Sequence, residues 1–276
     1  MRQTHFMPTD LPFGKKSRVR LAEHGRRALI FVHGFGGNAT GTWDLFSSLL
    51  PEEPLCAGND LFFYGYESLR QSAAYSAAEL RDWLYGILTA PASVVNALLP
   101  PSIPRRLDTF SYERVTISAH SLGAVVMRRA LLDLAANSAI AGPLDRVRIV
   151  LFAPAHMGGD VIRLAAEALG PLKLALFAPL LKFAWPSLKD LEPGSNTLFQ
   201  LRDDTLQALN RANAGQASTR HLIAEAVVHG QKDRIVSQNP FCSDPPLIRF
   251  EKRGHLEVCK PRSDYLDPIS VLLPYV

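Results

Sequence analysis

The sequence predicts an α/β fold whose mostly parallel central sheet is covered by helices on both faces. Short apolar runs of strand length alternate along the chain with segments of helical periodicity, which is the pattern typical of a parallel sheet. A length of 276 residues with 47% hydrophobic content is enough to bury one large core. No internal repeat, low-complexity segment or sharp change in composition divides the chain. We therefore expect a single domain over residues 1–276.

The strands are predicted from apolar runs that end in turn residues. Residues 28–33 enter a loop that contains Gly34, Gly36 and Gly37, so we expect a buried strand there. The short, mostly apolar run at residues 19–22 predicts a short strand at the edge of the sheet. The other predicted strands cover residues 61–64, 115–118, 148–152, 223–228 and 247–250.

Two helices are predicted from apolar residues spaced three or four apart. The first covers residues 72–88, where the apolar stripe consists of Leu80, Trp83, Leu84 and Ile87. A stretch punctuated by prolines follows it. The second helix covers residues 122–136 and connects two predicted strands.

Residues 157–195 are predicted to form a cap, or lid, inserted after the strand at 148–152. The part from 161 to 188 is dense in leucine and phenylalanine, but prolines and lysines interrupt it, so it is not a transmembrane span. Such a cap could bind acyl chains or touch a membrane surface, and Leu176 and Phe177 are its candidate substrate-binding residues. The alternative is that these apolar residues simply pack on the sheet.

The segment Val-Thr-Ile-Ser-Ala-His-Ser-Leu-Gly-Ala-Val-Val-Met, residues 115–127, places Ser121 at a turn between an apolar strand and an amphipathic helix. Small residues at Ala119 and Gly123 bracket the serine as in a G-x-S-x-G nucleophile elbow, although alanine replaces the first glycine. The sharp turn of such an elbow exposes the hydroxyl at the end of the sheet. Ser121 is therefore the candidate nucleophile.

A serine hydroxyl needs a histidine to accept its proton and a carboxylate to orient that histidine. Asp233 and His255 follow two successive apolar strands late in the chain, which brings both to the same edge of a parallel sheet as Ser121. The order Ser121, Asp233, His255 is that of the nucleophile, acid and base of a hydrolase built on such a sheet. The alternative is that Asp233 caps a loop and His255 bonds only to the main chain.

Attack on an ester carbonyl creates an oxyanion, and backbone N–H groups fixed beforehand stabilise it. By position, the amides of Phe35 and Leu122 would donate to that oxygen. Gly34 and Gly36 allow the loop to approach the substrate closely, so they are candidate substrate-binding residues. An ordinary glycine turn is the alternative. His33 is predicted to shape this loop by hydrogen bonding.

Two further histidines lie near the motifs. His120 precedes the nucleophile and is expected to pack and to form hydrogen bonds instead of acting as a base. His156 precedes two glycines at a strand end, so we expect it near the cleft as a substrate-binding residue and as the reserve catalytic histidine. It precedes Asp233 in the chain, however, which breaks the expected order.

Composition excludes several other classes of protein. The formal net charge of +4 is modest and no Lys/Arg block stands out, so no nucleic-acid partner is expected. Cys56, Cys242 and Cys259 are odd in number and lack metal-ligand spacing, which predicts free thiols and no metal site. The first residues lack the apolar core of a signal peptide, which favours a cytoplasmic protein that could lie at a membrane surface. The sequence leaves the oligomeric state open.

Four segments together resemble the lipase-like group of α/β-hydrolases that includes the GPI-inositol deacylases and related esterases. They are His33-Gly34-Phe35-Gly36-Gly37 with Thr42-Trp43, then Ala119-His120-Ser121-Leu122-Gly123, then Ala153-Pro154-Ala155-His156-Met157-Gly158, and the segment from Gly254 to Pro261. The resemblance implies an α/β-hydrolase fold and a triad serine hydrolase that acts on acyl esters, often of lipids. Ala119 and the extra Ala155 depart from the group's usual pattern.

These observations predict a serine esterase or lipase that hydrolyses an acyl ester or lipid through an acyl-enzyme intermediate. Ser121 would attack, His255 would transfer protons and Asp233 would orient the histidine. This chemistry requires no metal and no organic cofactor. The alternative from a different class is a non-catalytic hydrolase-fold scaffold that binds a lipid or a protein through its cap, because a fold alone does not establish activity.

Overall fold

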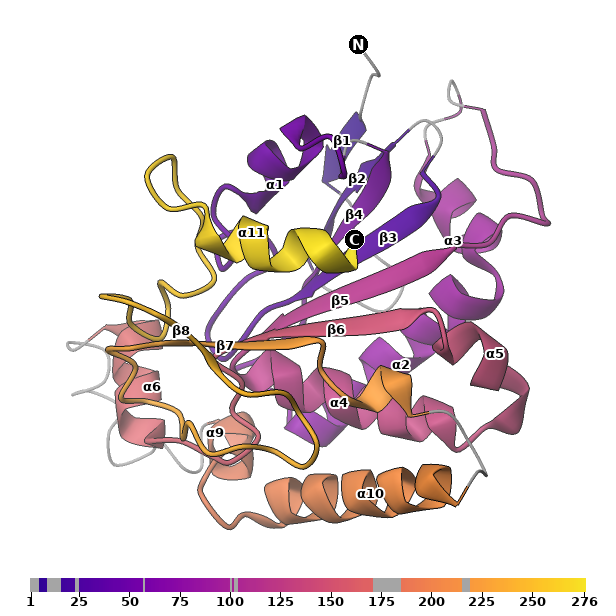
Figure 1. Cartoon of the computed structure of the whole chain (residues 1–276). Helices are drawn as coiled ribbons and strands as arrows, with labels where there is room; N and C mark the ends of the chain where they lie inside the picture. The colour runs from indigo at the N-terminus through magenta and orange to yellow at the C-terminus, as the bar shows by residue number, and fades with distance from the viewer. Residues whose placement is uncertain are drawn as a thin grey trace.

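The structure is a computed structural model, and it describes residues 5–8, 16–22, 25–56, 58–99, 101, 104–170, 185–214 and 219–276. Within these ranges the strands form one eight-stranded sheet in the order β1-β2-β4-β3-β5-β6-β7-β8 (Figure 1). The strands are β1 (His5–Pro8), β2 (Arg18–Leu21), β3 (Arg27–Val32), β4 (Asn59–Tyr64), β5 (Arg114–His120), β6 (Val147–Phe152), β7 (Ala226–Gly230) and β8 (Ile248–Phe250). The predicted α/β fold with a mostly parallel sheet is confirmed, because among the described strands only the β1–β2 and β2–β4 pairs are antiparallel.

The prediction that residues 19–22 form an edge strand is wrong. They fall largely in β2, which pairs with β1 on one side and with β4 on the other. Pairing between distant segments decides which strand lies at an edge. The apolar pattern of a four-residue strand does not carry that information.

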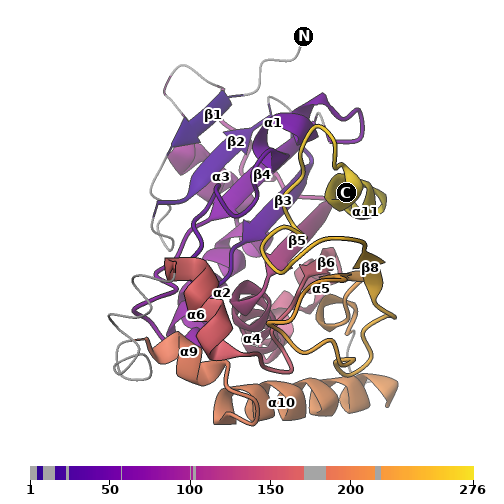
Figure 2. The same ribbon diagram turned by 90° about the vertical axis from the view of Figure 1, so that its left-hand side faces the viewer.

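Helices cover both faces of the sheet (Figures 1 and 2). Helices α2 (Ala73–Thr89) and α4 (Leu122–Ala135) pack together on one face, with α10 (Asn196–Asn213) outside α4. On the other face lie α1 (Phe46–Leu49) and α11 (Asp267–Leu272). The other described helices are α3 (Pro91–Leu98), α5 (Ala141–Leu144), α6 (Val161–Leu169) and α9 (Pro186–Asp190), with short 3₁₀ turns at Leu50–Glu52, Ser138–Ile140, Arg220–Leu222 and Leu273–Tyr275.

The two predicted helices are confirmed as α2 and α4, and local chemistry explains where α2 begins and ends. The Ser72 hydroxyl accepts a hydrogen bond from the Tyr75 amide at 3.2 Å, which caps the first turn. Pro91 follows the last residues of α2 and starts α3 in a new direction. Both helices turn an apolar face to the sheet, where Trp83 is 1% exposed.

Helix α10 is not among the predicted helices. Its N-terminus is capped by Ser195, whose hydroxyl accepts from the Leu198 amide at 3.3 Å. Its buried residues Leu198, Leu201, Thr205, Ala208 and Leu209 recur three or four positions apart, so the helical period is present in the sequence although charged residues surround it.

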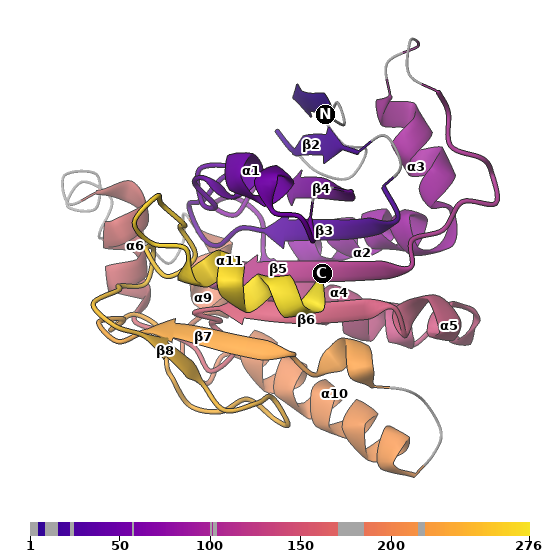
Figure 3. The same ribbon diagram turned by 45° about the horizontal axis from the view of Figure 1, so that its top comes forward.

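The parallel strands all end at the edge of the sheet near α6 (Figure 3). In the register of the sheet Val32 pairs with Ala119, and His120 pairs with Phe152. The loops that leave β3, β5 and β6 are therefore neighbours. In the described part of the chain no helix is long and apolar enough to span a bilayer.

Candidate active site

Ser121 lies in a sharp turn between β5 and α4. Its backbone has φ 53° and ψ −122°, in the region that favours glycine and costs free energy for any other residue. Main-chain hydrogen bonds hold the turn: the Ser121 amide donates to Phe152 O at 3.2 Å, and the Ser121 carbonyl accepts from the amides of Ala124 at 3.1 Å and Ala155 at 3.2 Å. The sheet and the loop after β6 therefore maintain a strained elbow.

Ala155, in the loop after β6, contacts the elbow. This residue is fully buried, and its amide reaches the carbonyl of the elbow serine. The loop thus braces the candidate nucleophile through its main chain.

Gly123 is required because the first turn of α4 packs directly on the end of β3. A Cβ atom at this position would lie 2.3 Å from the His33 carbonyl oxygen and 2.4 Å from that of Val32. Real Cβ atoms do not come so close to backbone oxygens, so any side chain would push α4 away from the sheet.

We expect Gly123→Ala to lower the free energy of unfolding by about 1–3 kcal/mol, the usual cost of overpacking a core. Displacement of α4 would also move Ser121. Chemical denaturation measures the first effect and ester turnover the second. Gly142→Ala is the matched control, because a Cβ there would meet no atom within 4 Å. An equal loss in the free energy of unfolding in Gly123→Ala and Gly142→Ala would contradict the packing explanation.

The structure brings Ser121, His255 and Asp233 together in one hydrogen-bonded series. His255 Nδ1 is 2.9 Å from Asp233 Oδ2, and His255 Nε2 is 3.0 Å from Ser121 Oγ. A carboxylate can only accept, so Nδ1 carries the hydrogen and the bare Nε2 accepts from the serine hydroxyl. In this tautomer the imidazole is ready to take the hydroxyl proton.

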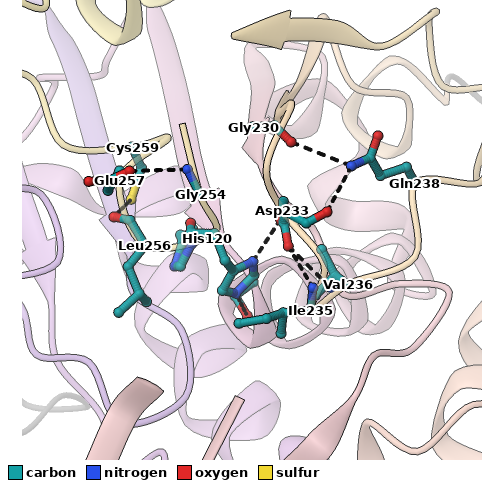
Figure 4. Close-up of polar contacts among 12 residues, drawn as sticks. His120, Gly230, Asp233, Ile235, Val236, Gln238, Gly254, Leu256, Glu257 and Cys259 are labelled. Atoms are coloured by element: carbon teal, nitrogen blue, oxygen red, sulfur yellow. Dashed lines mark hydrogen bonds and ion pairs between the residues drawn. The ribbon is translucent and has the colours of Figure 1, made fainter. Parts of the chain in front are cut away.

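Asp233 is held as an anion by the atoms around it (Figure 4). Burial alone would raise the pKa of its carboxyl, but the hydrogen bond and charge of His255 and the amides of Ile235 and Val236 outweigh burial and lower the pKa. Those two amides lie 2.9 and 3.4 Å from Oδ1. The Gln238 side chain donates to the carbonyls of Gly230 and Asp233 at 3.4 and 3.2 Å, which fixes the loop.

The loops that carry Asp233 and His255 approach each other through main-chain contacts. A Cβ on Gly230 would lie 2.3 Å from the Arg253 carbonyl oxygen, and the same oxygen accepts from the Lys232 amide at 2.9 Å. The Glu257 carboxylate accepts from the Gly254 amide at 3.2 Å. Close packing of two backbones therefore sets the distance between the acid and the base.

The loop after β3 lies against the elbow. A Cβ on Gly34 would be 2.8 Å from the Ser121 Cβ, so only glycine allows this approach. In the described part of the chain the amides of Phe35 and Leu122 donate to no other group, which leaves both available for an oxyanion.

His33 shapes this loop, as its position in the sequence suggested. Its Nδ1 donates to Gly34 O at 2.8 Å, and its Nε2 accepts from the Tyr66 amide at 3.3 Å. The ring stacks on Tyr66 with centroids 4.4 Å apart. Burial lowers the pKa of His33 to about 4, so the ring is neutral at pH 7 and its two hydrogen bonds are fixed.

A pocket of about 150 Å³ opens beside the Gly34–Gly37 loop. Its lining includes Gly34, Phe35 and Gly36 from the loop, and Glu167 and Ala168 from α6. Gly36 has φ 65°, and a Cβ there would lie 2.4 Å from the Ala168 Cβ, so α6 packs directly on the loop. Ser121 and His255 are 0% and 1% exposed, so both are buried beside this pocket.

The structure does not bring His156 to this pocket. Its ring packs on Phe241 with centroids 4.6 Å apart and lines a separate hollow of about 140 Å³ with Leu198 and Phe199. Burial, with the charge of Arg128, holds its pKa well below the usual range. These contacts do not support the expectation that His156 binds substrate or serves as a reserve base. Leu176 and Phe177 lie outside the described residues.

Several residues at the site carry no recognisable signal in the sequence. Gln238 and Glu167 reach it from a loop and from α6, where nothing in the surrounding pattern marks them. Burial raises the pKa of the Glu167 carboxyl, and the nearby His255 acts in the opposite direction. Within the described residues no group of three or more His, Cys, Asp and Glu side chains could hold a metal ion. Cys56, Cys242 and Cys259 are free thiols.

Comparison with known proteins agrees with this architecture. The sequence matches the alpha/beta hydrolase family over residues 29–259, and the chain belongs to that family. No curated protein sequence matches it. Its fold is similar to the mature form of the Bacillus licheniformis lipase BlEst2, with a TM-score of 0.53 and 11% identity over 99% of this chain and 98% of that one. It is also similar to the 2-hydroxy-6-oxo-6-phenylhexa-2,4-dienoate hydrolase of Rhodococcus sp. strain RHA1, with a TM-score of 0.51 and 13% identity over 99% and 100% of the two chains. Likeness at this identity establishes the fold alone.

Proposed function

We propose that this protein is a serine hydrolase that cleaves carboxylic esters, most naturally those of a lipid or other acyl substrate. The observation that carries the proposal is the continuous series of hydrogen bonds from Ser121 through His255 to Asp233. The strained elbow supports it, as do the amides of Phe35 and Leu122, which have no other acceptor among the described residues. The resemblance to the GPI-inositol deacylases and related esterases supports the acyl-ester class.

The reaction has two steps. Ser121 Oγ attacks the ester carbonyl carbon while its proton passes to His255 Nε2, and the amides of Phe35 and Leu122 hold the oxyanion. The C–O bond to the alcohol then breaks, and the alcohol leaves with the proton from His255. A water molecule attacks the acyl-enzyme with the same histidine as base, which releases the acid and restores Ser121.

The substrate-binding side is proposed to involve the cap at residues 157–195. Within its described part, α6 contacts Gly36 and lines the pocket, which supports a role in admitting the ester. Because Ser121 is 0% exposed, we propose that movement of α6 or of its neighbouring loops precedes binding. Contact of this cap with a lipid surface is part of the same proposal.

A fluorophosphonate probe tests the proposal, because it reacts covalently with an activated serine whatever the substrate. We expect one mole of probe per mole of protein, attached to the peptide that contains Ser121. The reaction is run with and without a dispersed lipid, since the site is closed in this structure. A panel of nitrophenyl esters of increasing chain length then measures acyl preference. Absence of labelling under both conditions would favour a non-catalytic scaffold.

A further inference from the structure

His120 lies between the proposed catalytic base, His255, and the loop at Gly34 that carries the proposed oxyanion donor. Its ring is 2% exposed, and its centroid is 4.8 Å from that of the His255 ring. Its Nε2 is 3.0 Å from the main-chain oxygen of His255. A carbonyl oxygen can only accept, so Nε2 carries a hydrogen and donates it.

The other side of the His120 ring faces the oxyanion loop. A Cβ on Gly34 would lie 3.0 Å from His120 Nδ1 and 3.1 Å from its carbonyl oxygen. Nδ1 is enclosed and has no hydrogen-bond partner among the described residues. Burial, with the charge of His255, lowers the pKa of His120 to about 3, so the ring is neutral and Nδ1 carries no hydrogen at pH 7.

Packing alone does not explain a histidine at this position. An enclosed nitrogen without a partner costs free energy, and an apolar side chain would fill the same space without that cost. The rigid ring supplies a donor at a fixed distance from the elbow, because it directly precedes Ser121 in the chain. It thereby links the elbow, the main chain of His255 and the Gly34 loop.

We infer that His120 is a positioning residue for the proposed ester hydrolysis, holding the main chain of His255 so that its ring meets both Ser121 and Asp233. This role rests on the proposed function. His120 moves no proton itself. A displacement of about 1 Å in a catalytic group can reduce the rate by about 100-fold, so loss of the His255 contact should be visible in kcat.

The test compares His120→Gln, His120→Asn and His120→Leu in the full-length protein, with a short-chain nitrophenyl ester as substrate. The glutamine Nε2 can take the place of the histidine Nε2 and still donate to His255 O, whereas asparagine is too short and leucine has no donor. We expect the His120→Gln variant to keep kcat within about threefold of wild type. The asparagine and leucine variants should lose roughly 10- to 100-fold in kcat with little change in KM. Fluorophosphonate labelling rates should fall in the same order.

His221→Leu is the matched control, because His221 is also a buried histidine, 3% exposed, and both its ring nitrogens lack a partner among the described residues. It should keep kcat even if its melting temperature changes. Equal kcat in wild type and His120→Leu, or an equal loss in all three His120 variants, would overturn the positioning role while leaving the hydrolase intact. Wild-type protein that neither labels nor turns over ester would instead overturn the proposed function, and the role of His120 with it.

Discussion

Replacing Ser121 by alanine is expected to abolish ester turnover and covalent labelling while the protein stays folded. Removal of a nucleophile from a triad of this kind costs about 10⁶-fold in kcat, because the remaining groups have no atom to form the acyl bond. The alanine leaves the sheet and α4 unchanged, since the main chain of Ser121 makes the contacts that hold the elbow. Turnover of a nitrophenyl ester and circular dichroism measure the two expectations.

A second variant separates loss of chemistry from loss of structure. Ser121 has φ 53°, so Ser121→Gly relieves backbone strain that Ser121→Ala retains. We expect the glycine variant to be inactive and more stable than the alanine variant, by up to about 1–3 kcal/mol in the free energy of unfolding. Turnover by either purified variant at the wild-type rate would eliminate Ser121 as the nucleophile.

Most of the fold and the core of the site could be predicted from the sequence because their signals are local. A buried parallel strand appears as a continuous apolar run, as in Ile30 and its neighbours, and the loop that follows it carries the chemistry. The chain order of Ser121, Asp233 and His255 adds a long-range constraint, because parallel strands place all three residues at one edge of the sheet. The structure places the three side chains within hydrogen-bonding distance in series.

The features that could not be predicted depend on contacts between distant segments. His156 follows a strand end just as Ser121 does, but its side chain turns towards Phe241 and not towards the pocket. The strand β1 is only four residues long, and pairing with β2 is what defines it. Glu167 reaches the pocket because α6 packs on Gly36, a contact that no pattern in either segment reveals.

Substitution of either other residue of the hydrogen-bonded series, Asp233 or His255, is also expected to cause a large loss of kcat. Asp233→Asn is expected to reduce kcat by about 10⁴-fold, because the amide can no longer hold His255 in the tautomer whose Nε2 accepts. The lowered pKa of Asp233 keeps its carboxylate ionised at neutral pH, so this loss reflects the missing anion across the neutral range. His255→Ala should lose about 10⁶-fold. The rate of ester cleavage under single-turnover conditions measures the loss in both variants.

The combined variants give the decisive comparison, since the three groups act as one unit. If Asp233 serves only to orient and stabilise His255, its substitution adds almost nothing once His255 is absent, so Asp233→Asn with His255→Ala should be about as slow as His255→Ala alone. Independent contributions would instead multiply, to about 10¹⁰-fold. His156→Ala provides the control, because the His156 ring packs on Phe241 and lines the separate hollow. This substitution should affect stability more than kcat. If His255→Ala is active and His156→Ala is inactive, the assignment of His255 as the base is wrong.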